Sequence, residues 1–402
     1  MTEKDIFNPK SFIEKQVSEI RTSLGGKKAV IACSGGVDST TCAVLTRRAV
    51  GGNLICIFID TNFMRLDEPE TVTNALSVPP LGLPIKLIRA EKRFMKALEG
   101  LTDAEEKRKA FRKTFYSVLC EAVKDENCEF LVQGTILPDI IETVKGIKTQ
   151  HNVLEQMEIN TKEVYGFSLI EPLVTLYKFQ VREVARLLGI PLETSERQPF
   201  PGPGLSVRVV GEITPAKLDV EKRVTTIVEE QLEELKPKQY FPATIDSVMT
   251  EYSRAGEAEK AVSNLLKRRD VTVTTKVLKT RATGIRSGGR LYGKVVTVDA
   301  RNAKGECIAL DPQQLDRVQK TITELDHDVS RVLFKFTDTE QSGRWLVAVR
   351  AVETLDFVTA SVFNIPWPVL KKTGDLILAS CKNVSAVYYD ITPKPPASIE
   401  FE

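Results

Sequence analysis

Apolar residues in the N-terminal part of the chain follow three patterns in turn. Over residues 9–24 they recur on one helical face, and the glycines at 25–26 end that pattern. Residues 29–33 form a short apolar run, residues 39–50 return to helical spacing, and residues 53–60 form a second apolar run. Short, wholly apolar runs are typical of strands buried on both faces of a parallel sheet. The succession therefore predicts a βαβ unit and an α/β fold.

The next part of the chain continues this alternation. Apolar runs at 85–89 and 130–133 predict two more strands, with a charged helical stretch between them. Residues 138–166 are polar and weakly periodic, and a connection of that length in a compact domain predicts a lid. The segment QPFPGPGL at 198–205 contains three prolines and two glycines, which is typical of a domain boundary. We therefore expect a first domain over 1–205.

The second half of the chain, residues 206–402, contains an internal repeat. Residues 315–334 align without gaps on residues 370–389, and each copy has the pattern of a helix, a short turn and a strand. A further strand precedes each copy, so we expect repeat units over about 280–334 and 343–390. Chance similarity of short apolar patterns is the alternative.

A glycine-rich turn lies between the first predicted strand and the helix that follows it. Its six residues are Ser34, Gly35, Gly36, Val37, Asp38 and Ser39. Two glycines let backbone N–H groups approach phosphate oxygens closely, and the following helix points its N-terminus at the same anion. A carboxylate would repel a bare phosphate, so Asp38 indicates a Mg²⁺ ion that bridges it to the phosphates. The alternative is an ordinary turn with Ser39 or Asp38 as the helix N-cap.

Composition excludes several classes of function. The chain carries 56 Lys and Arg against 54 Asp and Glu, so no overall field favours a nucleic acid or a membrane surface. It has no apolar run long enough for a membrane span, and its N-terminus lacks a signal core, which favours a cytoplasmic protein. Its two histidines, His151 and His327, exclude a histidine-rich metal centre. Its seven cysteines include no C-x-x-C pair.

The motif SGGVDS resembles that of the PP-loop ATP pyrophosphatases, which cleave ATP between its α and β phosphates. Four further stretches resemble, in order, the GMP synthetase family: QGTILPDIIE at 133–142, RQPFPGPGL at 197–205, RAVETLDF at 350–357 and YDITPKPPASIE at 389–400. The resemblance implies a parallel-sheet PP-loop domain, of the adenine nucleotide alpha hydrolase-like class. A smaller α+β dimerisation domain would follow it, and the chain would form a homodimer.

The resemblance also implies a reaction in two steps. The C2 oxygen of xanthosine monophosphate (XMP) attacks the α-phosphate of ATP, and pyrophosphate leaves with the help of Mg²⁺. Ammonia then displaces AMP from C2 and gives GMP. Positioning and electrostatics would carry the catalysis, which agrees with the shortage of histidine.

Roles for individual residues follow from the same resemblance. Asp38, with Lys148 and His151 in the lid, would be catalytic, and Asp38 would also hold the metal. The other residues that bind ATP and pyrophosphate would be Ser34, Gly35, Gly36, Val37, Ser39, Gly134 and Thr135. XMP would be bound by Arg197, Lys394, Ile399 and Glu400. Lys394 is suited to its phosphate and Glu400 to the purine N–H edge.

The family's usual source of ammonia is a glutaminase domain placed before the PP-loop domain. Only 28 residues precede Ala29 here, and neither histidine lies in a glutaminase-like setting. The chain therefore resembles the separate synthetase subunit of two-subunit archaeal enzymes, and we expect a separate glutaminase as its partner.

Several positions depart from the family pattern. Gln150 and Gln198 replace histidines, Asn62 stands where glycine is usual, Gly288 where an acidic residue is usual, and Arg112-Lys113 where Gly-Arg is usual. These departures leave two alternatives open. One is a paralogous PP-loop ligase that adenylylates a related nucleotide or another acceptor, and the other is a nucleotide-binding module without turnover.

The C-terminal residues 392–402 carry three prolines and few large apolar side chains. Such a segment is expected to take a defined shape only when a ligand orders it, here through Lys394 and Glu400. Its deletion is then expected to weaken XMP binding and to leave the thermal stability unchanged. A solvated charge at the chain's end is the alternative for Lys394.

Overall fold

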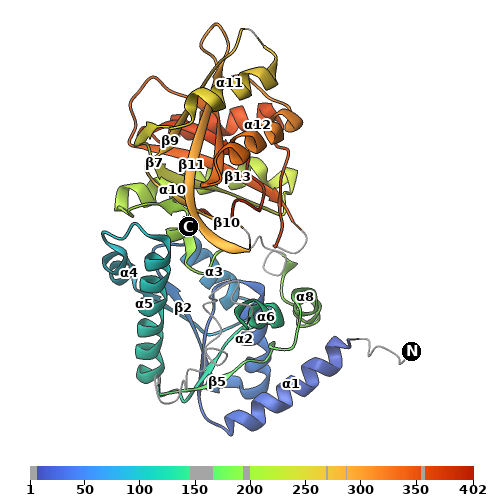
Figure 1. Cartoon of the computed structure of the whole chain (residues 1–402). Helices are drawn as coiled ribbons and strands as arrows, with labels where there is room; N and C mark the ends of the chain where they lie inside the picture. The colour runs from blue at the N-terminus through green and yellow to red at the C-terminus, as the bar shows by residue number, and fades with distance from the viewer. Residues whose placement is uncertain (1–6, 145–165, 193–199, 269, 287, 355–357) are drawn as a thin grey trace, which may run out of the picture. The chain divides into compact units, whose positions relative to one another are not determined.

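The computed structural model describes residues 7–144, 166–192, 200–268, 270–286, 288–354 and 358–402 (Figure 1). The chain divides into two compact units. Residues 1–97 and 111–202 form the first unit, and residues 98–110 and 203–402 form the second. The sequence did not indicate that residues 98–110 belong with the C-terminal half.

The first unit is built on a parallel sheet of five strands in the order β3-β2-β1-β4-β5. The strands are β1 (Ala29–Ala32), β2 (Leu54–Asp60), β3 (Ile85–Arg89), β4 (Phe130–Val132) and β5 (Ser168–Ile170). From β1 the chain builds outward through β2 and β3, and β4 then returns to the other side of β1. In such sheets ligands bind at the carboxyl ends of the strands where the order reverses, which here is between β1 and β4.

Helices cover this sheet, and their apolar faces form its core. They are α1 (Pro9–Leu24), α2 (Val37–Val50), α3 (Glu68–Ser77), α4 (Glu91–Leu98), α5 (Ala104–Asp125), α6 (Leu137–Val144) and α8 (Lys178–Leu187). The α1 helix begins where Asn8 accepts a hydrogen bond from Ser11 N at 3.1 Å, and it ends at Gly25 in the left-handed region. Apolar side chains of α1, α2 and α8 lie in one core cluster with those of β1 and β2.

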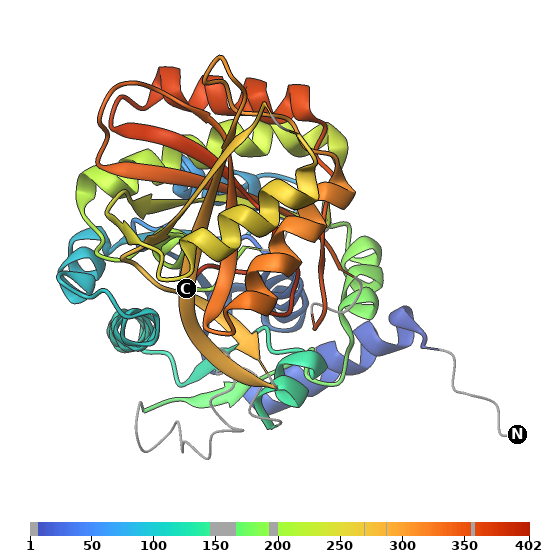
Figure 2. The same cartoon turned by 45° about the horizontal axis from the view of Figure 1, so that its top comes forward.

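The second unit contains a mixed sheet of ten strands, in the order β6-β7-β13-β15-β12-β11-β9-β8, with β10 paired to β11 and β14 to β13. The strands are β6 (Val209–Val210), β7 (Gln239–Asp246), β8 (Met249–Glu251), β9 (Thr272–Leu278), β10 (Ala282–Arg286), β11 (Gly289–Arg301), β12 (Val329–Asp338), β13 (Trp345–Glu353), β14 (Ser361–Val362) and β15 (Val384–Asp390). Four helices pack on one face of this sheet around a single core (Figure 2). They are α10 (Pro215–Leu232), α11 (Ala255–Leu266), α12 (Pro312–Leu325) and α13 (Trp367–Ser380).

Two strand–helix–strand units lie side by side in this sheet. In one, β11 and β12 pair in parallel around α12, and in the other β13 and β15 pair in parallel around α13. The antiparallel pair of β12 and β15 joins them. The aligned stretches 315–334 and 370–389 cover corresponding parts of the two units, namely the helix and the second strand.

The C-terminal residues are part of the second unit's core, so the expectation of a segment without its own shape is wrong. Phe401 is fully buried, and its ring centroid lies 4.0 Å from Cζ of Arg331. Its carbonyl oxygen accepts a hydrogen bond from Thr283 N at 2.8 Å. The carboxylate of Glu402 is also fully buried and pairs with the buried ammonium of Lys107. One aromatic anchor and buried ion pairs hold a segment that has few large apolar side chains.

Candidate active site

The SGGVDS turn follows β1 directly and leads into α2. Gly35 has φ +77°, in the region that favours glycine, and a Cβ at this position would lie 2.7 Å from Cγ1 of Val72. Both the backbone conformation and the available space therefore require glycine. The turn brings backbone N–H groups to the start of α2, whose N-terminal end carries a partial positive charge.

Hydroxyl groups of the turn hydrogen-bond to the turn itself. The Ser39 hydroxyl donates to Gly36 O at 3.1 Å and accepts a bond from Ser34 N at 3.3 Å. The Ser34 and Ser39 hydroxyl oxygens lie 3.1 Å apart. Ser34 is exposed, whereas Gly35 and Val37 are buried. The loop is thus held in shape by its own side chains, with Ser34 facing outward as a further donor.

The Asp38 carboxylate has two different surroundings. Its Oδ2 accepts a hydrogen bond from Nζ of Lys178 at 2.5 Å. Its Oδ1 is buried, and no residue that the structure describes gives it a hydrogen bond. A buried carboxylate oxygen without a donor is costly unless a cation takes that place.

A Mg²⁺ ion fits this arrangement. Mg²⁺ is usually held by one or two carboxylates together with substrate phosphates and water. Among the described residues, no cluster of three or more His, Cys, Asp or Glu side chains forms a candidate metal site. Asp38 is therefore suited to a metal that arrives with the nucleotide.

The stretch after β4 lies directly against the start of α2. A Cβ at Gly134 would be 3.0 Å from Ser39 N and 3.1 Å from the carbonyl carbon of Asp38. The Thr135 hydroxyl is buried and donates to the Glu171 carboxylate. Gly134 thus abuts the motif as its backing, and the side chain of Thr135 belongs to the frame behind it.

We expect Gly134→Ala to weaken ATP use by about tenfold or more, because the added methyl displaces the backbone at Asp38 and Ser39, and small misplacements at reacting groups are costly. The rate of ATP-dependent pyrophosphate release and the ATP affinity measure this effect. Gly52→Ala is the control, since a Cβ there meets no atom within 4 Å. Equal ATP affinities for the two variants would contradict this role of Gly134.

The residues predicted to bind XMP lie in the second unit where the structure describes them. The Glu400 carboxylate accepts two bonds from the buried guanidinium of Arg208, at 3.0 Å from Nε and 3.1 Å from Nη2. Lys394 is mostly buried, and its backbone pairs in both directions with Ala360. Ile399 is half-buried against the apolar cluster that includes Phe401. Sequence reasoning missed Arg208, because its partner is distant along the chain.

Three predicted residues and most of the lid lie outside the described residues. They are Lys148, His151 and Arg197. Of the lid predicted over 138–166, residues 138–144 form part of α6.

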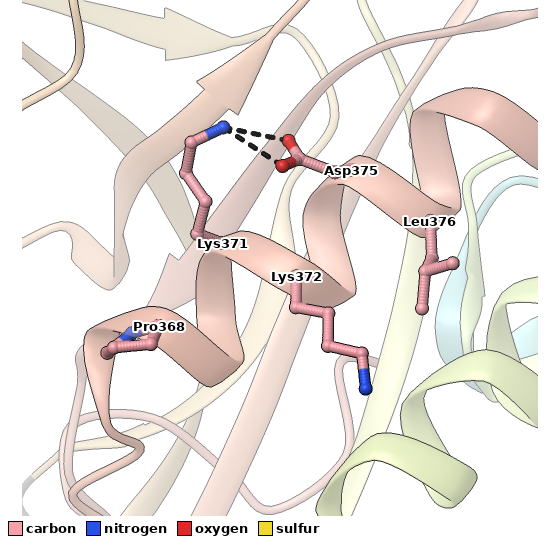
Figure 3. A pocket seen from close by; sticks show the side chains of 5 residues that line it. All are labelled: Pro368, Lys371, Lys372, Asp375 and Leu376. Atoms are coloured by element: carbon pink, nitrogen blue, oxygen red, sulfur yellow. Dashed lines mark hydrogen bonds and ion pairs between the residues drawn. The ribbon is translucent and has the colours of Figure 1, made fainter.

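A hollow of 510 Å³ lies elsewhere, over α13 in the second unit (Figure 3). It is lined by Pro368, Lys371, Lys372, Asp375 and Leu376. Lys371 and Asp375 pair with each other at 2.9 Å along the helix. None of the predicted site residues lines this hollow.

Comparison with known proteins assigns the chain to a family. The family model described as NAD synthase matches residues 6–205, and the one described as GMP synthase C terminal domain matches residues 337–401. A subunit of the glutamine-hydrolyzing GMP synthase of Sulfurisphaera tokodaii is 41% identical over 98% of this chain and 100% of its own length. This chain belongs to the same family of GMP synthase subunits. The corresponding proteins of Saccharolobus solfataricus and Methanopyrus kandleri are 41% and 39% identical, each over 99% of this chain and 100% of their own length.

Membership of this GMP synthase family confirms the family predicted from the sequence motifs. It also confirms the fold class, a parallel PP-loop domain followed by an α+β domain with a mixed sheet. The search for membrane spans, over the described residues, finds no helix that is both long and apolar enough.

One departure from the GMP synthase pattern has a structural explanation. Asn62 has φ +70°, in the left-handed region where the family's usual glycine is most at ease, and asparagine is among the few residues that tolerate it. Its N–H donates to Oδ1 of Asp60 at 2.9 Å, while Arg89 Nη1 lies 3.2 Å from Oδ2. Burial raises the pKa of Asp60, and the bond from Asn62 opposes that rise. The turn after β2 is therefore kept despite the substitution.

Lys178, which reaches Asp38, is another residue that sequence reasoning missed. It is the first residue of α8, where a positive charge opposes the helix dipole. A lysine at the start of a predicted helix is therefore a usable signal, because it is favourable only where an anion lies nearby.

Proposed function

We propose that this chain performs the synthetase half of GMP formation. In that reaction ATP adenylylates the C2 oxygen of XMP, and ammonia then displaces AMP, with pyrophosphate as the other product. The observation that carries the proposal is Asp38, whose carboxylate faces Lys178 on one side and lacks a donor among the described residues on the other. It stands in a phosphate-binding turn of a chain from the GMP synthase family.

The turn's own groups account for the first step. Backbone N–H groups at 35–39 and the Ser34 hydroxyl would bind the pyrophosphate portion of ATP, as preorganised donors do where charge develops. Asp38 would hold Mg²⁺, which when bound would offset the charge of the leaving pyrophosphate. Lys178 would exchange its bond to Asp38 for one to a phosphate oxygen as the nucleotide enters.

The XMP site is proposed in the second unit. Lys394 would bind the XMP phosphate, Ile399 would contact the base, and Glu400 would accept from the purine N–H edge. The Arg208 guanidinium supports this role of Glu400, since it fixes the carboxylate while ionised oxygens keep further acceptor sites. Arg197 on the nucleotide, and Lys148 and His151 as catalytic residues, stay predictions. A homodimer of this chain is also a prediction.

We expect the purified chain to form GMP from XMP, ATP and ammonium, and to be inert with glutamine alone. Ammonia attacks carbon only in its unprotonated form, so the rate at fixed total ammonium should rise with pH through the neutral range. GMP and AMP are measured by chromatography. AMP release with another acceptor but not with XMP would favour the paralogous ligase, and GMP formation from glutamine by the chain alone would contradict the need for a partner.

A further inference from the structure

The α8 helix has a buried face and an exposed face. Val181, Val184 and Ala185 are fully buried in the core that α8 shares with α1 and α2. On the outer side, Phe179 is 60% exposed and Leu187 is 51% exposed. Large exposed apolar side chains that lie near one another mark binding surfaces more often than isolated ones do.

The exposed face begins with a pair of aromatic rings. The rings of Tyr177 and Phe179 are stacked, with centroids 6.1 Å apart and planes 14° apart. The exposed Arg186 lies further along the same helix, next to Leu187. Aromatic residues and arginine are enriched in the centres of protein interfaces, and they supply most of the energetically dominant contacts. This set of residues, called here the α8 surface, is Tyr177, Phe179, Arg186 and Leu187.

The α8 surface starts beside the nucleotide motif. Lys178 lies between the two aromatic residues, and its Nζ reaches Asp38 at 2.5 Å. A protein seated on Tyr177 and Phe179 would therefore lie within the first unit's own surroundings of SGGVDS. An ammonia source has to be near that motif, because the adenylylated C2 atom is formed there.

The occupant follows from what this chain lacks. Its relatives are named as one subunit of a glutamine-hydrolyzing GMP synthase, while this sequence has two histidines and no glutaminase set. We propose that the α8 surface is the docking site of the separate glutaminase subunit. This inference rests on the proposed function and adds the place of the partner to it.

The variant Phe179→Asp tests the proposal, with Val78→Asp as its matched control. Val78 is 52% exposed and lies in the same unit, at the end of α3. With the cognate glutaminase added, Phe179→Asp should raise the apparent Kd for that partner by about tenfold or more, measured from glutamine-dependent GMP formation. Its ammonium-dependent rate should stay unchanged, and Val78→Asp should alter neither rate.

Other outcomes overturn the proposal. An unchanged Kd for the glutaminase would do so directly. An equal fall of the ammonium-dependent rate would place Phe179 in the nucleotide site, and a change of the chain's own mass in solution would point to a second copy as the occupant. Arg186→Glu provides a second variant if Phe179→Asp does not fold. Failure of the wild type to make GMP from ammonium would instead contradict the proposed function.

Discussion

Asp38→Asn should lower XMP-dependent AMP release by roughly 10²–10³-fold or more, the usual cost of removing a group that stabilises charge in the transition state. Asparagine keeps the shape of the side chain and removes the charge that would hold Mg²⁺. The buried Oδ1, which has no hydrogen-bond donor among the described residues, is the atom that this change affects most. AMP release at several Mg²⁺ concentrations measures the effect, and the Mg²⁺ requirement should rise with the loss of rate.

Two controls accompany this variant. Asp125→Asn alters an exposed carboxylate at the end of α5 in the same unit and should leave AMP release unchanged. Circular dichroism should show the same fold for Asp38→Asn and the wild type, because Lys178 is 43% exposed and can be solvated without Asp38. Near-normal turnover by Asp38→Asn would show that this carboxylate does not hold the metal.

Deletion of residues 394–402 should unfold the second unit. The change removes the buried Phe401 ring, and loss of a buried Phe side chain costs about 3–5 kcal/mol. It also leaves Lys107 and Arg208 buried without Glu402 and Glu400, and breaking a buried pair costs about 3–5 kcal/mol. Together these losses approach the whole stability of an ordinary domain, which is about 5–15 kcal/mol.

Thermal unfolding and limited proteolysis measure this second effect. The single variant Phe401→Ala should lower the melting temperature while leaving the fold in place, and Lys372→Ala on the exposed face of α13 should have no effect. A truncated chain that melts like the wild type and loses only XMP affinity would instead support a segment that its ligand orders.

Local patterns carried the prediction of the first sheet. The apolar runs at 29–33, 53–60, 85–89 and 130–133 correspond to β1–β4, because a strand buried on both faces needs nearly every residue to be apolar. The C-terminal segment could not be predicted in this way. Its partners are distant in sequence, as Lys107 and Glu402 are 295 positions apart, and no periodicity records such a contact.

The candidate site divides along the same line. The residues of SGGVDS are contiguous, so their motif and its chemistry could be recognised together. Lys178 is 140 positions from Asp38, and its contact depends on how α8 packs against α2. Gly134 could be singled out by its motif, but its tight fit against α2 follows only from the pairing of β4 with β1.

The ends of the ten-stranded sheet bear on how this chain can associate with itself. Its outermost strands, β6 and β8, have only two and three residues. The free side of β10 is occupied by the C-terminal segment, because Thr283 N and Ile285 N donate to the carbonyl oxygens of Phe401 and Pro396. Long unpaired strand edges are the templates for aggregation and for sheets that continue from one molecule into the next. Within the described residues this sheet offers almost no such edge, so two copies that meet through the second unit have to do so through side chains.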